Sequence, residues 1–228
     1  MLSYEFAKDL IGKYGSPLVV YSMEQLEANY ARLEKALPKN SQIVYSVKAN
    51  PNPMILKLFC ELGAFFETAS EKEFILVMEN GISATRIIYS GQAKTREGII
   101  NALTKGVFLF NLESIHEVEM MVELTNELHK EARVLCRINP NYNSNNAILK
   151  MGGKPSAFGI DENEIEKAIE LCNGSYVILS GLFMYNGSQY YEAKSIFNNS
   201  KYLYDLSLKI MKLYGLKFNY IDYGGDLE

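Results

Sequence analysis

The sequence predicts an α/β fold, a TIM-like (β/α) barrel that is incomplete. Short runs rich in Val, Ile, Tyr and Phe alternate with helical stretches along nearly the whole chain, as is typical of a parallel sheet covered by helices. No Gly-x-Gly-x-x-Gly follows the first of these runs, which disfavours a dinucleotide-binding doubly wound sheet. We expect about seven strands, one fewer than a closed barrel, within a single domain over residues 1–228 because no linker interrupts them.

The expected strands are short, β-favouring runs that end at turns or at polar residues. Their apolar and β-branched composition fits parallel strands buried beneath helices. They are expected near residues 43–48, 63–68, 86–90, 107–111, 133–138, 177–185 and 218–223.

Several expected helices begin at a recognisable cap. Ser22, Ser70 and Ser114 each precede Gln or Glu by three residues, which is the capping-box pattern. The segment 139–160 shows no regular pattern, and we expect a functional loop over the barrel mouth there. The helices are expected near residues 3–13, 23–37, 53–62, 70–80, 95–105, 114–130, 161–172 and 190–214.

Charge and cysteine content exclude several classes of function. A net charge of −4 and a pI near 5.4 argue against nucleic acid or an anionic membrane as a partner. No apolar run has the length of a membrane span. Cys60, Cys136 and Cys172 lie far apart and form no disulfide or metal pattern, so we expect a reduced, cytoplasmic setting and no metal site.

The run "IVYSVKANPN" places Lys48 at the end of the first expected strand. Burial there would lower the lysine pKa, and a neutral amine can form a Schiff base with a carbonyl group. The alternative is a lysine that clears the strand end and is solvated. Other unusual residues share the carboxyl ends of strands, where parallel barrels bind ligands: Glu67, Gly91, Asn111, Arg137, "YNGSQ" from Tyr185 and "DYGGD" from Asp222.

Two glycine pairs after the last expected strands favour an anion site. Gly187-Ser188 and Gly224-Gly225 offer backbone N–H groups that no Cβ obstructs, and Ser188 adds a hydroxyl donor. Phosphate sites in such barrels tend to form from the last loops. A phosphate site and a lysine at one mouth predict pyridoxal phosphate as the cofactor.

Several motifs occur in an order that resembles a known family: "YSVKANPNPM", "FETASEKEF", "RINP", "FGID", "GLFMYNGSQ" and "DYGGD". The chain resembles the N-terminal, alanine-racemase-like barrel of the fold-type-III pyridoxal-phosphate decarboxylases, the diaminopimelate, ornithine and arginine decarboxylase group. This resemblance implies a lyase that decarboxylates an amino acid through a Schiff base on Lys48. "MGGKPSAFGID" and "MYNGSQ" are most similar to a branch from biosynthetic clusters, in which some members act on amino-acid groups tethered to carrier proteins.

The resemblance also assigns residues to the cofactor. It implies that Lys48 holds the cofactor, that Glu67 lies beside it, and that Arg137 and Asn139 line its pocket. Tyr185 stands where most of the family has a histidine stacked on the cofactor ring, and an aromatic side chain can still stack. The phosphate would be bound by Ser188, Gly224 and Gly225.

Two acidic residues of these motifs are assigned differently. Asp226 replaces the third glycine of the usual phosphate loop, and its carboxylate would repel a phosphate and weaken binding. Glu73 also matches the family, but it completes an expected capping box, so we assign it to structure.

The resemblance further implies that 228 residues are an incomplete catalyst. In the family, later sequence supplies the eighth strand, an acid for the pyridine nitrogen, and a β-rich domain with a catalytic cysteine. We therefore expect a homodimer or a complementary C-terminal half as partner, beside a small amino-acid substrate. Two alternatives stay open: a degenerate or non-catalytic cofactor-binding barrel, and an alanine-racemase-like enzyme, which "VKANPNP" fits less well because no Tyr-Gly follows.

Overall fold

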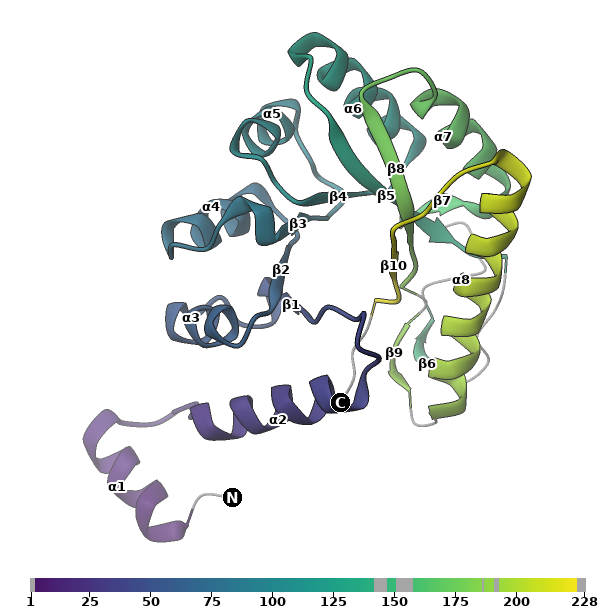
Figure 1. Cartoon of the computed structure of the whole chain (residues 1–228). Helices are drawn as coiled ribbons and strands as arrows, with labels where there is room; N and C mark the ends of the chain where they lie inside the picture. The colour runs from purple at the N-terminus through teal and green to yellow at the C-terminus, as the bar shows by residue number, and fades with distance from the viewer. Residues whose placement is uncertain (1–2, 142–146, 151–157, 186, 191–192, 225–228) are drawn as a thin grey trace.

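Seven parallel strands lie side by side and curl into an open half-barrel, with helices on the outer face (Figure 1). The computed structural model describes residues 3–141, 147–150, 158–185, 187–190 and 193–224. The strands follow the order β1-β2-β3-β4-β5-β8-β10, and within the described residues β1 and β10 do not pair with each other. The expected incomplete TIM-like barrel of seven strands is therefore confirmed.

The seven strands overlap the seven expected ranges. Each pairs in parallel with its neighbours, and the register shifts once, between β5 and β8, where Val134 pairs with Leu179 but Leu135 pairs with Gly181. The bounds are β1 (Val44–Ser46), β2 (Phe65–Thr68), β3 (Ile87–Tyr89), β4 (Leu109–Leu112), β5 (Ala132–Asn139), β8 (Val177–Phe183) and β10 (Tyr220–Asp222).

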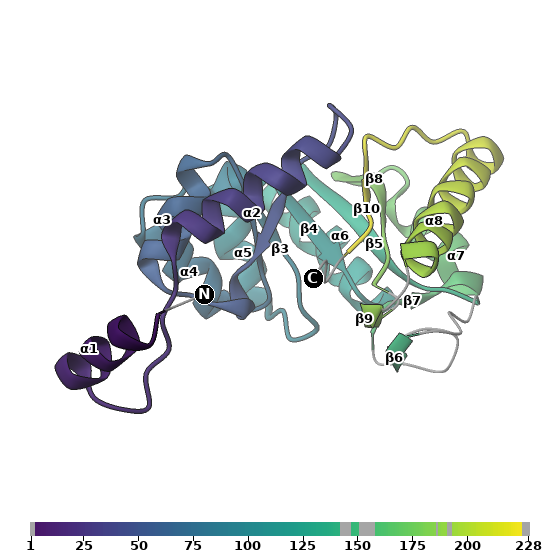
Figure 2. The ribbon, with the colours of Figure 1, turned by 90° about the horizontal axis from the view of Figure 1, so that it is seen from below.

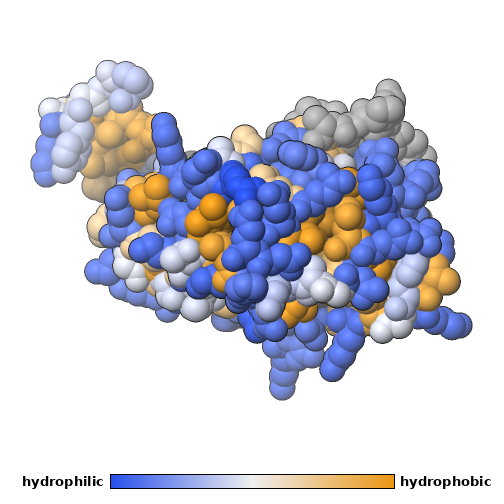
Figure 3. All heavy atoms as spheres, turned by 90° about the horizontal axis from the view of Figure 1, so that it is seen from above, coloured by the Kyte–Doolittle hydropathy of each residue, from blue (hydrophilic) through white to orange (hydrophobic). Residues whose placement is uncertain are grey.

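Each helix lies in or close to its expected range. In Figures 1 and 2, α1 is set apart from the barrel, and none of its residues is buried. Its apolar side chains reach the surface in the view from above (Figure 3). The bounds are α1 (Tyr4–Tyr14), α2 (Met23–Ala36), α3 (Pro53–Glu61), α4 (Glu71–Glu79), α5 (Arg96–Lys105), α6 (Ile115–Leu128), α7 (Ile165–Cys172) and α8 (Ala193–Tyr214), with 3₁₀ turns η1 (Val47–Ala49), η2 (Ala84–Arg86) and η3 (Glu162–Glu164). None of the described helices combines the length and apolar character that a membrane span requires.

The serine caps form as expected. The glutamate of the Ser70 capping box, however, bonds to the residue before the cap and not to the cap itself. The Ser70 and Ser114 hydroxyls accept hydrogen bonds from the N–H groups three residues on. The Glu73 carboxylate accepts from the Ala69 N–H at 2.7 Å, one residue before the cap. This contact satisfies a backbone donor at the strand-to-helix turn and fits the structural role expected for Glu73.

The expectation of an irregular segment over 139–160 is wrong in two places. β6 (Ala147–Lys150) pairs antiparallel with β9 (Gly187–Tyr190), and β7 (Ile160–Asp161) extends the end of β5 in parallel. Both pairings join segments far apart in sequence, so no local periodicity marks them. Ser188 consequently lies in a strand, and not in the loop that the glycine pair suggested.

The strands separate two apolar regions, because successive side chains point to opposite faces. The larger region packs between sheet and helices and contains Phe66, Phe74, Tyr89, Leu112 and Met121 among many others. The smaller region, the inner cluster, lines the concave face and consists of Ile88, Leu109, Leu135 and Phe183. The inner cluster closes the floor of the half-barrel below the carboxyl ends of the strands.

Candidate active site

The concave face changes from apolar to polar toward the carboxyl ends of the strands. Residues two positions apart on a strand share a face, so the residues after the inner cluster face the same interior. These are polar or amphipathic: Ser90, Asn111, Arg137 and Tyr185, joined on neighbouring strands by Ser46, Glu67 and Asp222. Parallel barrels bind their ligands at this end.

Lys48 lies in the turn η1, directly after β1. Its side chain is exposed, so the burial considered from the sequence is wrong. The strand stops at Ser46, and the following turn carries the lysine beyond the sheet. Its Nζ atom nevertheless lies 5.9 Å from the centre of the Tyr185 ring. The amine therefore reaches the mouth from the solvent side.

Arg137 approaches the same ring from the sheet. Its Cζ atom is 5.9 Å from the centre of the Tyr185 ring, and it also lies 4.9 Å and 5.3 Å from the ring centres of Phe158 and Phe183. The arginine is only 8% exposed. Tyr185 thus shares its ring with two cations, as cation–π geometry allows.

Two carboxylates come from the strands beside this group. Ser46 lies opposite Glu67 in the β1–β2 register, and the two side chains are hydrogen-bonded at 3.0 Å between Oγ and Oε2. Burial raises the pKa of Asp222 to about 6, and the Glu67 carboxylate adds to this rise. The Gly224 N–H, 2.9 Å from Asp222 Oδ1, opposes it, and Asn111 and Arg137 lower the pKa further.

The loop after β10 passes close to Tyr185. Gly224 has φ +60, and a Cβ there would lie 2.9 Å from the Met184 carbonyl oxygen and 3.1 Å from Tyr185 Cδ2. Glycine tolerates both the conformation and the close approach. Gly225, Asp226 and the Ser188 side chain lie outside the described residues, so the predicted phosphate loop is described only through Gly224.

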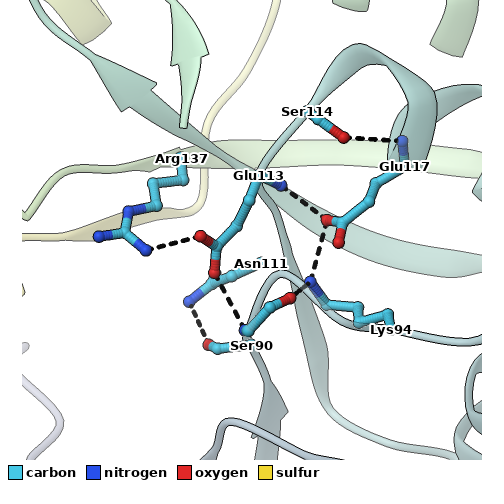
Figure 4. Close-up of polar contacts among 8 residues, drawn as sticks. Ser90, Lys94, Asn111, Glu113, Ser114, Glu117 and Arg137 are labelled. Atoms are coloured by element: carbon cyan, nitrogen blue, oxygen red, sulfur yellow. Dashed lines mark hydrogen bonds and ion pairs between the residues drawn. The ribbon is translucent and has the colours of Figure 1, made fainter. Parts of the chain in front are cut away.

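A charged network at the mouth contains two residues that the sequence did not single out, Lys94 and Glu113 (Figure 4). Glu113 forms an ion pair with Arg137 at 2.6 Å, and Lys94 forms one with Glu117 at 3.0 Å. Glu113 was missed because it follows the strand end, although it lies two residues beyond Asn111. Side chains two residues apart on a strand share a face, so continuing this alternation past the end of β4 would have indicated Glu113.

These residues fit a flat, phosphorylated aldehyde such as pyridoxal phosphate. Lys48 offers an amine, Tyr185 a ring on which a flat cofactor can stack, and Arg137 a fixed positive charge. Gly224 lets the loop after β10 pack closely against Tyr185. Within the described ranges, no group of three or more His, Cys, Asp or Glu side chains is arranged to hold a metal ion.

The family model for the pyridoxal-dependent decarboxylases, pyridoxal binding domain, matches residues 23–227. The chain belongs to this family. The expected likeness to the N-terminal domain of the fold-type-III decarboxylases is confirmed, and so is pyridoxal phosphate as the cofactor of the family.

Curated relatives and solved structures agree with this assignment. The L-glutamyl-[BtrI acyl-carrier protein] decarboxylase of Niallia circulans is 33% identical over 217 residues, which are 95% of this chain and 51% of that protein. Diaminopimelate decarboxylase of Aquifex aeolicus is 32% identical over 96% of this chain and 52% of its own length.

Among solved structures, the M. jannaschii diaminopimelate decarboxylase in co-complex with L-lysine superposes with a TM-score of 0.86 at 30% identity, over 95% of this chain and 52% of that one. The chain therefore spans about half the length of the relatives that it matches.

Proposed function

We propose that this chain is the cofactor-binding part of a pyridoxal-phosphate-dependent amino-acid decarboxylase, and that Lys48 bonds to the cofactor. The observation that carries the proposal is the shared ring of Tyr185, which has the Lys48 amine and the Arg137 guanidinium each 5.9 Å from its centre. Membership of the decarboxylase family supports the reaction class.

When bound, the cofactor supplies an electron sink for the charge that remains after carbon dioxide leaves. The side chains of this chain hold and orient it. Tyr185 would stack on the cofactor ring, and Asp222 places a carboxylate near both Glu67 and the fixed charge of Arg137. Ser188, Gly224 and Gly225 are proposed to bind the phosphate group. Lys48, exposed at the strand end, is free to bond to the cofactor from the solvent side.

The proposed substrate class is an amino acid that keeps its α-carboxylate, either free or tethered to a carrier protein. The similarity to a carrier-protein glutamyl decarboxylase supports the tethered form, and the similarity to diaminopimelate decarboxylases supports the free form. We propose that further catalytic groups come from a second copy or from a complementary polypeptide matching the other half of the relatives. A non-catalytic barrel remains the second candidate, because the described site contains no assigned proton donor for carbon.

Cofactor labelling tests the role of Lys48. The purified chain is titrated with pyridoxal phosphate, reduced with borohydride and digested, and we expect the label on the peptide that contains Lys48. Lys48→Ala should abolish the labelling. Lys57→Ala is the matched control, because Lys57 is an exposed lysine on α3 that pairs only loosely with Glu61 at 4.0 Å. A label that is unchanged in Lys48→Ala would refute the assignment.

Release of carbon dioxide separates the candidate functions. Free glutamate, diaminopimelate and a glutamyl-carrier conjugate are offered to the chain alone and to the chain with a complementary C-terminal half. We expect little release from the chain alone and clear release from the pair. Cofactor binding without release in either case would favour the non-catalytic barrel. L-alanine is offered separately, and its racemisation would favour the racemase-like alternative.

A further inference from the structure

The charged network at the mouth suggests how Arg137 is held. We propose that Glu113 is a positioning residue that fixes the Arg137 guanidinium against Tyr185, and that the Lys94–Glu117 pair holds Glu113 in place. We call these four residues the clamp (Figure 4). This inference deepens the proposed function and rests on it for its effect on the cofactor.

Both carboxylate oxygens of Glu113 are engaged. Oε2 accepts from Arg137 Nη1 at 2.6 Å, and Oε1 accepts from the Gly91 N–H at 3.0 Å. The side chains of Glu113 and Arg137 are 3% and 10% exposed. Rotation of this carboxylate would break one of two charge-assisted bonds in a site where water is scarce, so its orientation is fixed.

The backbone of Glu113 is held as well. Its N–H donates to Glu117 Oε2 at 2.8 Å, and the same oxygen accepts from Lys94 Nζ at 3.0 Å. Lys94 also donates to the Gly91 carbonyl oxygen within the loop after β3, and the bonds of Gly91 to Glu113 and of Lys94 to Glu117 tie this loop to the segment after β4. Burial raises the pKa of Glu117, and the Lys94 charge partly opposes this rise.

Gly91 gives this arrangement a rigid base. Its φ is +93, and a Cβ there would lie 2.2 Å from the Ala69 carbonyl oxygen. The residue therefore packs against the turn after β2, and its N–H and its carbonyl both belong to the network. The clamp carries two positive and two negative groups, so the buried charges balance.

As a consequence, the plane of the Arg137 guanidinium is fixed. One nitrogen is held by Glu113, and three aromatic rings lie within 5.9 Å of its Cζ atom. A planar guanidinium can satisfy a carboxylate and stack on rings together, whereas a lysine ammonium cannot. The clamp thus holds the Arg137 guanidinium in one orientation against the Tyr185 ring before any ligand binds. This is the preorganisation that a binding site needs.

The first test needs no cofactor. Side-chain ¹⁵N NMR of the ligand-free chain should show slowly rotating, protected guanidinium signals for Arg137, which disappear in Glu113→Gln. Glu123→Gln is the matched control, because Glu123 pairs with Arg96 on the exposed face of α6. Arg137 signals that are unchanged in Glu113→Gln would overturn the clamp, whatever the chain binds.

The second test is a double-mutant cycle on the affinity for pyridoxal phosphate. We expect Glu113→Gln and Arg137→Gln each to weaken binding about tenfold, and the double variant to bind no more weakly than Arg137→Gln alone, since Glu113 acts through Arg137. Additive losses, or wild-type affinity in Glu113→Gln, would overturn the inference. A wild-type chain that binds no cofactor would refute the proposed function instead, and the NMR result would then decide the clamp.

A further variant covers the case in which Glu113→Gln does not fold. Arg137→Lys keeps the positive charge beside Glu113 but removes the planar fork. A loss of cofactor affinity as large as in Arg137→Gln supports the role of orientation, and wild-type affinity overturns it.

Discussion

The wall of the half-barrel, β3, β4 and β5, differs from its edge strands β1 and β10. Every residue of β3 and β4 is buried, whereas β1 is half-buried throughout and β10 has one exposed and two half-buried residues. The candidate site spans both regions. Arg137 is on β5 and Glu113 directly follows β4, at the wall. Asp222 is on β10 and Lys48 lies in the turn after β1, at the edges.

This difference shows that the wall and the edges have separate tasks in the site. The wall orients the charged groups, and the edges give a ligand access to the reactive amine. Wall strands pair on both sides and are covered by helices, so their side chains are fixed by packing. Edge strands pair on one side within the described residues and have fewer buried contacts, which lowers the cost of local opening. The fixed charges lie on the rigid part, and the reactive amine lies where a ligand can reach it.

The largest expected effect is on the wall. Gly91→Ala should destabilise the chain by about 4 kcal/mol, because the new Cβ would meet the Ala69 carbonyl oxygen at a backbone conformation that disfavours L side chains. Urea unfolding monitored by circular dichroism measures it. Gly106→Ala is the control: its φ is +75 but no atom lies within 4 Å, so we expect a loss of about 1 kcal/mol. Equal losses would show that the close contact at Gly91 relaxes freely.

A pair of truncations compares wall and edge directly. Leu112 on β4 is fully buried, and Leu112→Ala should cost about 3 kcal/mol through lost contacts and a cavity. Ile221 on β10 is half-buried, and Ile221→Ala should cost roughly 1 kcal/mol. Both are read from urea midpoints at one pH. If Ile221→Ala proves as costly as Leu112→Ala, the edge is as firmly packed as the wall.

The smallest effect concerns the pH dependence of stability at the edge. Burial raises the pKa of Asp222 to about 6, so the folded chain binds a proton that the unfolded chain has already released. The stability that Asp222 contributes therefore decreases as pH rises from about 4 to 6. The full shift corresponds to about 3 kcal/mol, and we expect about 1 to 2 kcal/mol because the half-buried side chain is partly screened by solvent. Asp222→Asn should remove this decrease in stability with pH. The part of the pH dependence that is due to Glu117, whose pKa is also raised, should stay. Unfolding midpoints at pH 4 and pH 7 measure the change, and an unaltered slope would place Asp222 in contact with solvent.

The strands of the wall were easier to predict from sequence than the pairing of β6 with β9. Strands such as β4 and β5 are continuous apolar runs, so composition and alternation with helices located them. β6 and β9 each have four residues and pair across about forty residues of intervening chain, which leaves no local pattern. Contacts of this kind depend on tertiary structure and not on periodicity.

The candidate site divides in the same way. Lys48, Glu67, Arg137 and Tyr185 were indicated because strand ends converge in a parallel barrel, and their roles toward the cofactor stay predictions. The exposed Lys48 was considered only as the alternative to a buried one, because the sequence could not show that β1 ends two residues early. Lys94 was missed because the sequence assigned its partner Glu117 to the capping box of α6. A capping box does not indicate that the same carboxylate also binds a lysine.

The register shift between β5 and β8 bears on how this chain tolerates insertions and deletions. Ser180 has no counterpart on β5, since Leu179 pairs with Val134 and Gly181 with Leu135. Before it, Val177 and Leu179 pack under the helices; after it, Leu182 and Met184 do, while Phe183 joins the inner cluster. A deletion of Ser180 would leave Leu179 followed directly by Gly181, which already pair with the consecutive residues Val134 and Leu135, so the strand would run without the bulge and Tyr185 would keep its side of the sheet. Deletion of a paired residue further along β8, such as Leu182, would instead exchange the two faces beyond it and turn Tyr185 away from Lys48.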